Sequence, residues 1–99
     1  MSKYRQAAKI DSNQPRIVSE LRTAGFTVET GYDDIIVGKN NVTLWVEVKT
    51  EDCYSKRTGK LKESAKTKSQ KKLDLEFTGA RIYAKCSGEI FDWFGVNIK

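Results

Sequence analysis

Two charged side chains in the middle of the sequence have the types and the spacing that metal-assisted chemistry requires. Glu47 and Lys49 lie two residues apart in Val42–Lys49, a run whose β-branched and aromatic residues are typical of a strand. Side chains alternate between the two faces of a strand, so Glu47 and Lys49 project from one face while apolar residues occupy the other. Charges in an otherwise apolar strand are costly to bury, which favours a chemical role for them.

Asp33 and Asp34 supply further carboxylates at the start of the preceding strand, which we expect at residues 33–37. A tight hairpin loop at residues 38–41 would bring this end close to Glu47, with one aspartate pointing toward it. Two carboxylates on adjacent strands can hold one Mg²⁺ or Mn²⁺ ion. A neighbouring lysine can hold or polarise the water that such a metal makes acidic, which is a histidine-free route to phosphodiester hydrolysis.

The same pattern has a simpler interpretation, and both stay open at this point. Glu47 and Lys49 would then form an ion pair on a solvated face of the sheet, and Asp33 and Asp34 would belong to a turn. The spacing of these four residues occurs by chance in many chains, so it does not decide between the two interpretations.

The composition excludes several other kinds of catalytic chemistry. The 99 residues contain no histidine, which rules out histidine general bases, Ser-His-Asp and Cys-His nucleophile systems, and histidine metal ligands. The two cysteines, Cys53 and Cys86, are too few for a structural zinc site or a disulfide framework, so we expect free thiols in a reducing cytoplasm. The length fits a single domain over residues 1–99, and no apolar run is long enough to span a bilayer.

Positive charge is concentrated in one segment of this chain of net charge +5. Between positions 56 and 72, eight basic residues stand against one acid, Glu63: Lys56, Arg57, Lys60, Lys62, Lys66, Lys68, Lys71 and Lys72. Such a segment is typical of a protein that binds a polyanion. No aromatic residue lies between Tyr54 and Phe77, so the segment suits contact with phosphates better than stacking on bases. The alternative is a solvated, flexible loop.

Periodicity and turn residues predict an α/β (α+β) domain with the order α-β-β-β-α-β and a short ending. Residues 1–10 show no period and are expected to form a loose arm, and residues 51–66 a long basic loop. One helix of about ten residues begins near Pro15 and ends before Gly25, and a second spans about 68–77 and is stopped by Gly79. Strands are expected at 26–30, 33–37, 42–49 and 81–85, and a short strand or helical turn at 89–94.

These residues resemble a known nuclease family. Asp34, followed after 12 residues by Glu47-Val48-Lys49, is similar to the PD-(D/E)xK nuclease signature. The surrounding sequence resembles the small stand-alone VRR-NUC domains of phages and bacteria in four places: Asn13 to Gly25, Gly31 to Gly38, Leu44 to Lys49, and Thr67-x-x-Gln70. The resemblance covers roughly residues 10–93. It implies a restriction-endonuclease-like core with a central mixed sheet flanked by helices.

The resemblance also implies roles for individual residues. Asp34 and Glu47 would bind Mg²⁺ or Mn²⁺, with the Val48 carbonyl as a third ligand. Lys49 would position or activate the attacking water and offset the charge that develops on the phosphorane. Gln14 occupies a position where many relatives carry a helix glutamate, and it would act through water or a phosphate; the alternative is a polar residue of the first helical turn.

Gln70 has two competing interpretations. The resemblance places it facing the active site. The spacing Thr67-x-x-Gln70 is that of a capping box, in which the same side chain hydrogen-bonds to the backbone at Thr67. One departure also leaves an alternative open: the family's usual proline before the aspartate is Asp33 here, so either Asp33 or Asp34 could be the metal ligand.

The function implied by the resemblance is a Mg²⁺-dependent DNA endonuclease that acts on branched DNA such as Holliday junctions, as a homodimer without an organic cofactor or a membrane partner. The DNA backbone would be contacted by the basic residues, namely Lys56, Arg57, Lys60, Lys62, Lys66, Lys68 and Lys71. The alternative is a non-catalytic nucleic-acid-binding module that uses the same Lys56–Lys72 segment.

Overall fold

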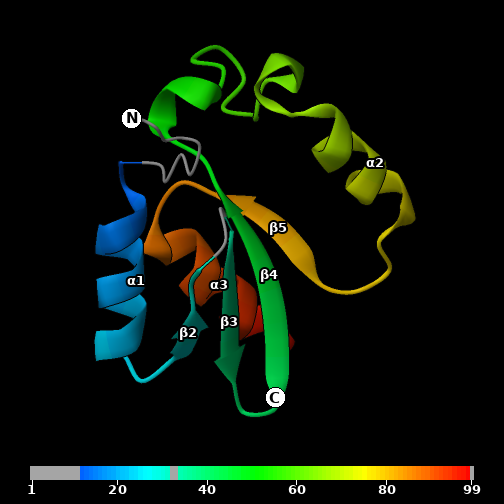
Figure 1. Cartoon of the computed structure of the whole chain (residues 1–99). Coiled ribbons are helices and arrows are strands. Elements are labelled where there is room, and N and C mark those ends of the chain that lie inside the picture. Colours follow the sequence, from blue (N-terminus) through cyan, green and yellow to red (C-terminus); the bar gives the residue numbers. More distant parts are fainter. Residues whose placement is uncertain (1–11, 32–33, 99) are drawn as a thin grey trace, which may run out of the picture.

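The computed structural model describes residues 12–31 and 34–98, which form a mixed four-stranded sheet and three helices (Figure 1). The expected N-terminal arm and Asp33 lie outside the described residues. The element order is α1 (Gln14–Thr23), β2 (Thr27–Glu29), β3 (Ile35–Lys39), β4 (Val42–Val48), α2 (Lys68–Glu76), β5 (Arg81–Ala84) and α3 (Ser87–Asn97), with short 3₁₀ turns at Glu51–Cys53 and Glu63–Ala65. The predicted α/β class and the order of its first six elements are therefore confirmed.

The strands lie in the order β2-β3-β4-β5, and only the last pair is parallel. The β3–β4 hairpin turns through Asn40 and Asn41, which both have positive φ (51° and 67°) as a two-residue hairpin turn of this twist requires. The expected four-residue loop 38–41 was too long, because Gly38 and Lys39 still pair with Thr43 and Val42. Strand β4 is central, so its side chains meet neighbours from both adjacent strands.

One hydrophobic core lies between the sheet and the two helices α1 and α3. Alternate residues of β4, namely Leu44, Val46 and Val48, are buried in it together with Leu21 of α1 and Ile90 of α3. The opposite face of β4 carries the odd-numbered residues, and α2 lies on this side. Figure 1 shows α2 standing apart from the α1 and α3 layer.

Helix α1 confirms the predicted start and stop. Pro15 lies in its first turn, and Gly25, with φ +92°, follows the C-cap residue Ala24. Its N-cap Asn13, however, makes no side-chain cap bond. Instead the Asn13 Nδ2 donates to the carbonyl oxygens of Lys49 (3.0 Å) and Lys85 (2.9 Å), which follow the parallel strands β4 and β5. Asn13 thereby fastens the start of α1 to the carboxyl ends of both strands.

The C-terminal segment is a full helix rather than the short strand or single turn expected at 89–94. Helix α3 spans Ser87–Asn97 and buries Ile90 and Phe94 in the core. Its aromatic residues favour a strand locally, but packing of Phe94 against Phe26 (ring centroids 5.1 Å apart) decides the conformation. None of the helices in the described chain is long and apolar enough to cross a membrane.

Substitution of Asn13 tests this connection between helix and sheet. We expect N13A to lower the free energy of unfolding by about 1–3 kcal/mol, because two part-buried carbonyls lose their donor. N13D should cost more, since a carboxylate would then face two carbonyl oxygens. Urea unfolding of both variants measures this, with the exposed S12A as control. Equal stability of N13A and the parent protein would contradict the role given to Asn13.

Candidate active site

The site is built around two carboxylates that face each other across β3 and β4. Ile35 pairs with Val46, so the antiparallel register places Asp34 opposite Glu47. The Glu47 side chain is 8% exposed. The Trp45 Nε1 donates a 2.5 Å hydrogen bond to the Asp34 Oδ2, which fixes the aspartate from the neighbouring position on β4. Asp34 therefore lies opposite Glu47, whereas the other aspartate considered, Asp33, lies outside the described residues.

Both oxygens of Glu47 are held by the protein. Its Oε1 accepts from the Gln70 Nε2 at 3.1 Å, and its Oε2 accepts from the Arg81 Nη2 at 3.3 Å. A carboxylate has about four lone-pair sites, so capacity for further interactions remains. The contacts therefore orient the carboxylate without saturating it.

Lys49 shares the face of Glu47, as the strand alternation predicts. Its Nζ donates to the Gln70 Oε1 at 3.0 Å and to the Ala65 carbonyl oxygen at 2.8 Å. An ammonium group has three N–H donors. These two hydrogen bonds hold the side chain in place, and residues 12–31 and 34–98 offer no partner for the third N–H.

Gln70 makes the contacts of the capping box and also contacts Glu47 and Lys49. Its Oε1 accepts from the backbone N–H of Thr67 at 3.1 Å, completing the predicted capping box at the start of α2. The same amide group bridges Lys49 and Glu47. A glutamine can do this because its oxygen accepts more than one hydrogen bond while its nitrogen donates.

A second layer of charges surrounds Glu47 on the β5 side. Arg81, whose side chain is 5% exposed, donates to the Asp74 Oδ1 of α2 at 2.6 Å, and the Tyr83 hydroxyl donates to the same oxygen at 2.9 Å. Lys66 pairs with the Asp74 Oδ2 at 3.0 Å. Burial alone would raise the pKa of Asp74, but these three donors lower it instead. Asp74 therefore anchors α2 to the sheet as a carboxylate.

The pKa of Glu47 is raised to about 7. Burial is the largest cause, followed by hydrogen bonding to Asp34 and repulsion from its charge, whereas the Arg81 guanidinium opposes the rise. A divalent cation between the two carboxylates would remove the repulsion, and oxygen donors of this kind suit Mg²⁺ or Mn²⁺. The donor set thus fits the metal that the sequence predicts.

The described residues hold no group of three or more acidic or cysteine side chains that could ligate a metal. A metal here would therefore depend on Asp34 and Glu47 together with main-chain oxygens and water. The Val48 side chain is buried in the core on the other face of the sheet, so Val48 can contribute only its carbonyl.

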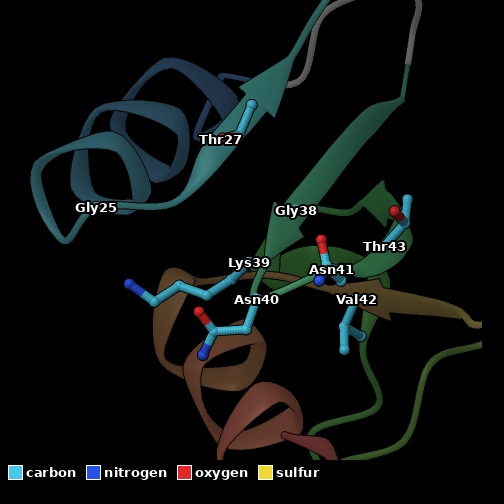
Figure 2. A pocket seen from close by; sticks show the side chains of 8 residues that line it. All are labelled: Gly25, Thr27, Gly38, Lys39, Asn40, Asn41, Val42 and Thr43. Carbon is cyan, nitrogen blue, oxygen red and sulfur yellow. The ribbon is translucent and has the colours of Figure 1, made fainter.

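The carboxylates open into a cleft of about 630 Å³ between β4 and the start of α2. Asp34, Glu47 and Gln70 line it with Trp45 and Leu73. A second hollow, of about 510 Å³, lies at the far end of the β3–β4 hairpin (Figure 2). Its described lining has no carboxylate, and its Lys39 ammonium lies 5.1 Å from the Phe26 ring centroid. The cleft lined by Asp34, Glu47 and Gln70 is therefore the candidate active site.

Gln14 is placed differently from the other predicted site residues. Its side chain is buried, its Oε1 has no hydrogen-bond partner among the described residues, and it lines a separate hollow beside Val18 and Arg22. The carboxylate cleft has no contribution from Gln14 among its described lining residues. The Asn13 bonds nonetheless keep this end of α1 at the end of β4 that carries Lys49.

The basic residues divide into two groups. Lys66 is only 17% exposed in its side chain and pairs with Glu63 and Asp74, so it is part of the site's inner network. The others are exposed: Lys56, Arg57, Lys60 and Lys62 before α2, and Lys68, Lys71 and Lys72 on it.

Sequence reasoning missed Arg81, Asp74 and Tyr83. Arg81 and Tyr83 alternate in a predicted strand, and the parallel register pairs them with Trp45 and Glu47. Two polar side chains at alternate positions of an otherwise apolar strand were the available signal. That these side chains lie beside Glu47 follows only from the parallel pairing of β5 with β4.

Comparisons of the chain with models of known protein families, with curated proteins and with solved structures find no match.

The raised pKa of Glu47 predicts a specific pH dependence of stability. The folded protein keeps the Glu47 proton to a higher pH than the unfolded chain, so stability is lost as pH rises from about 4.5 to about 7. In E47Q this loss is absent. Without metal, the variant should therefore gain roughly 1–3 kcal/mol relative to the parent protein between pH 4.5 and pH 8.

Thermal unfolding in EDTA across this pH range provides the measurement. The matched control is E76Q, which removes an exposed glutamate of α2. Parallel stability curves for E47Q and the parent protein would show that Glu47 carries no electrostatic strain.

Proposed function

We propose that the protein is a metal-dependent endonuclease that hydrolyses phosphodiester bonds in DNA. The observation that carries the proposal is that Asp34, Glu47 and Gln70 line one cleft, and that the Gln70 amide also accepts from Lys49 beside it. A surface ion pair between Glu47 and Lys49 would need neither the burial of Glu47 nor a second carboxylate facing it.

Asp34, Glu47 and the Val48 carbonyl are the groups that would hold Mg²⁺ or Mn²⁺, which supplies Lewis-acid activation of water and phosphate. Gln70 orients the Glu47 carboxylate and the Lys49 ammonium at the same time. The proposal gives the remaining N–H of Lys49 the role of donating to the attacking water or to a phosphate oxygen, where it would offset developing negative charge.

The arrangement of elements supports the assignment to a restriction-endonuclease-like, VRR-NUC type core. The proposed ligands lie on or directly next to the central antiparallel hairpin, and helix α2, with Gln70 in its first turn, follows. Strand β5 then pairs parallel to β4. The additional helix α3 covers the core face and leaves the carboxylate face open.

Branched DNA and a homodimer are parts of the same proposal. A two-fold symmetric pair would present two clefts to two strands of one junction. Both described cysteines, Cys53 and Cys86, are free, which fits the reducing cytoplasm that we propose as the location.

The direct test is cleavage of a labelled four-way junction and a matched linear duplex, each with Mg²⁺ or with EDTA. We expect Mg²⁺-dependent paired cuts in the junction, which K49A and E47A reduce about 10²–10³-fold. E76A, which removes an exposed acid of α2, should cut like the parent protein.

DNA binding in EDTA should persist in K49A, because this lysine is one cation among many. Equal cleavage of the linear duplex would keep the nuclease and refute the preference for branches. Intact but shifted DNA with every divalent metal tried would refute the nuclease and leave the alternative, a nucleic-acid-binding module.

A further inference from the structure

The long basic loop expected at residues 51–66 contains an ordered hairpin. This hairpin, residues 53–62, is here named the finger. Tyr54 and Leu61 form an antiparallel bridge. The backbone N–H of Ser55 donates to the Lys60 carbonyl oxygen at 2.8 Å, and that of Lys62 to the Cys53 carbonyl oxygen at 2.9 Å. Figure 1 shows this segment above the sheet, between β4 and α2.

The tip of the finger is held by its own backbone and by the side chains of Ser55 and Thr58. The Gly59 N–H donates to the Ser55 carbonyl oxygen at 2.7 Å. The Ser55 Oγ accepts from the backbone N–H groups of Arg57 (3.2 Å) and Thr58 (3.3 Å). Gly59 has φ +74°, a conformation that other L-residues adopt only at a cost, so the turn depends on glycine.

The base of the finger is anchored to the fold. Tyr54 is 9% exposed, and the Lys85 Nζ lies 4.7 Å from its ring centroid. Lys85 also pairs with Glu51 at 3.1 Å, and the Lys62 Nζ donates to the Asp52 carbonyl oxygen. The finger is therefore a pre-ordered projection beside the strand that carries Glu47.

The tip carries three exposed cations, Lys56, Arg57 and Lys60, and no acid lies between Tyr54 and Lys62. Within residues 12–31 and 34–98 none of the three takes part in an ion pair. They differ in this from Lys66, which two acids neutralise. The positive potential of the basic segment is thus available at the tip.

We propose that the finger is a docking element for the backbone of double-stranded DNA. This rests on the proposed function only in taking DNA as the partner. The tip has no aromatic side chain on which an unpaired base could stack, because Tyr54 is buried at the base. A duplex offers the denser row of phosphates, and the fixed tip contacts it without an ordering cost at binding.

The experiment measures affinity for a short duplex in EDTA as a function of salt, so cleavage plays no part. The variant K56A/R57A/K60A should lower the slope of log K against log salt by about 2.7, since each lost phosphate contact removes about 0.9. The comparison variant K68A/K71A/K72A removes the same charge from α2, where Lys68 and Lys71 are also expected contacts, and should lower the slope by less than K56A/R57A/K60A does. An equal or larger loss in the comparison variant would overturn the proposal.

The ordered conformation is tested by changing Gly59 alone. G59A keeps every charge, and its Cβ meets nothing within 4 Å, so only the backbone is strained. We expect about fivefold weaker duplex binding with an unchanged salt slope, and recovery in G59N, because asparagine tolerates positive φ. Unchanged binding by G59A would show that the tip need not be pre-ordered.

The class of DNA that the finger binds is tested in the same binding assay. Single-stranded DNA of the same length should bind more weakly than the duplex, and K56A/R57A/K60A should change its slope less. If single-stranded DNA binds as tightly as the duplex, double-stranded DNA is not the preferred partner of the finger, and the proposal is refuted. If the protein never cuts DNA but the salt slopes change as expected, the finger proposal stands and the proposed nuclease activity is refuted.

Discussion

The burial of the Glu47 carboxylate next to that of Asp34 is the constraint on which the other parts of the site depend. Two like charges at adjacent strand positions repel each other, and burial removes much of the water that would screen them. Hydrogen-bond donors offset part of this repulsion: Gln70 and Arg81 donate to Glu47, and Trp45 donates to Asp34. These contacts leave the carboxylates aligned but under-neutralised, which is a suitable starting state for a cation site.

Helix α2 is held in position mainly by this network and not by burial of an apolar face of its own. Every residue of α2 stays at least partly exposed. It is held by Gln70 at its start, by Asp74 in its middle, and by Phe77 just after its end, where the ring packs edge-on against Trp45 at 5.1 Å. The contacts that orient Glu47 and Lys49 are therefore the same contacts that place α2 over the sheet.

Local sequence signals predicted much of the fold and the centre of the site. Strand alternation placed Glu47 and Lys49 on one face, and the capping-box spacing placed the start of α2. The features that these local signals could not predict depend on contacts between residues distant in sequence. Arg81 reaches Glu47 only through the parallel pairing of β5 with β4, and helix α3 forms because the core buries Ile90 and Phe94.

The finger and Asn13 show the same limit. The finger has a single bridged pair, Tyr54 and Leu61, too little for a periodic pattern. Asn13 stood in a typical N-cap position, yet its side chain bonds to the ends of two strands. In both cases tertiary contacts, rather than local propensity, determine what the residue does.

Titration of the protein with Mn²⁺ by isothermal calorimetry at pH 8, without DNA, tests the central claim most directly. The account predicts one ion bound per chain, with at least about tenfold weaker binding in D34N and in E47Q, since each variant removes one charged ligand. Equal Mn²⁺ affinity in the parent protein and both variants would contradict the assignment of Asp34 and Glu47 as the metal site.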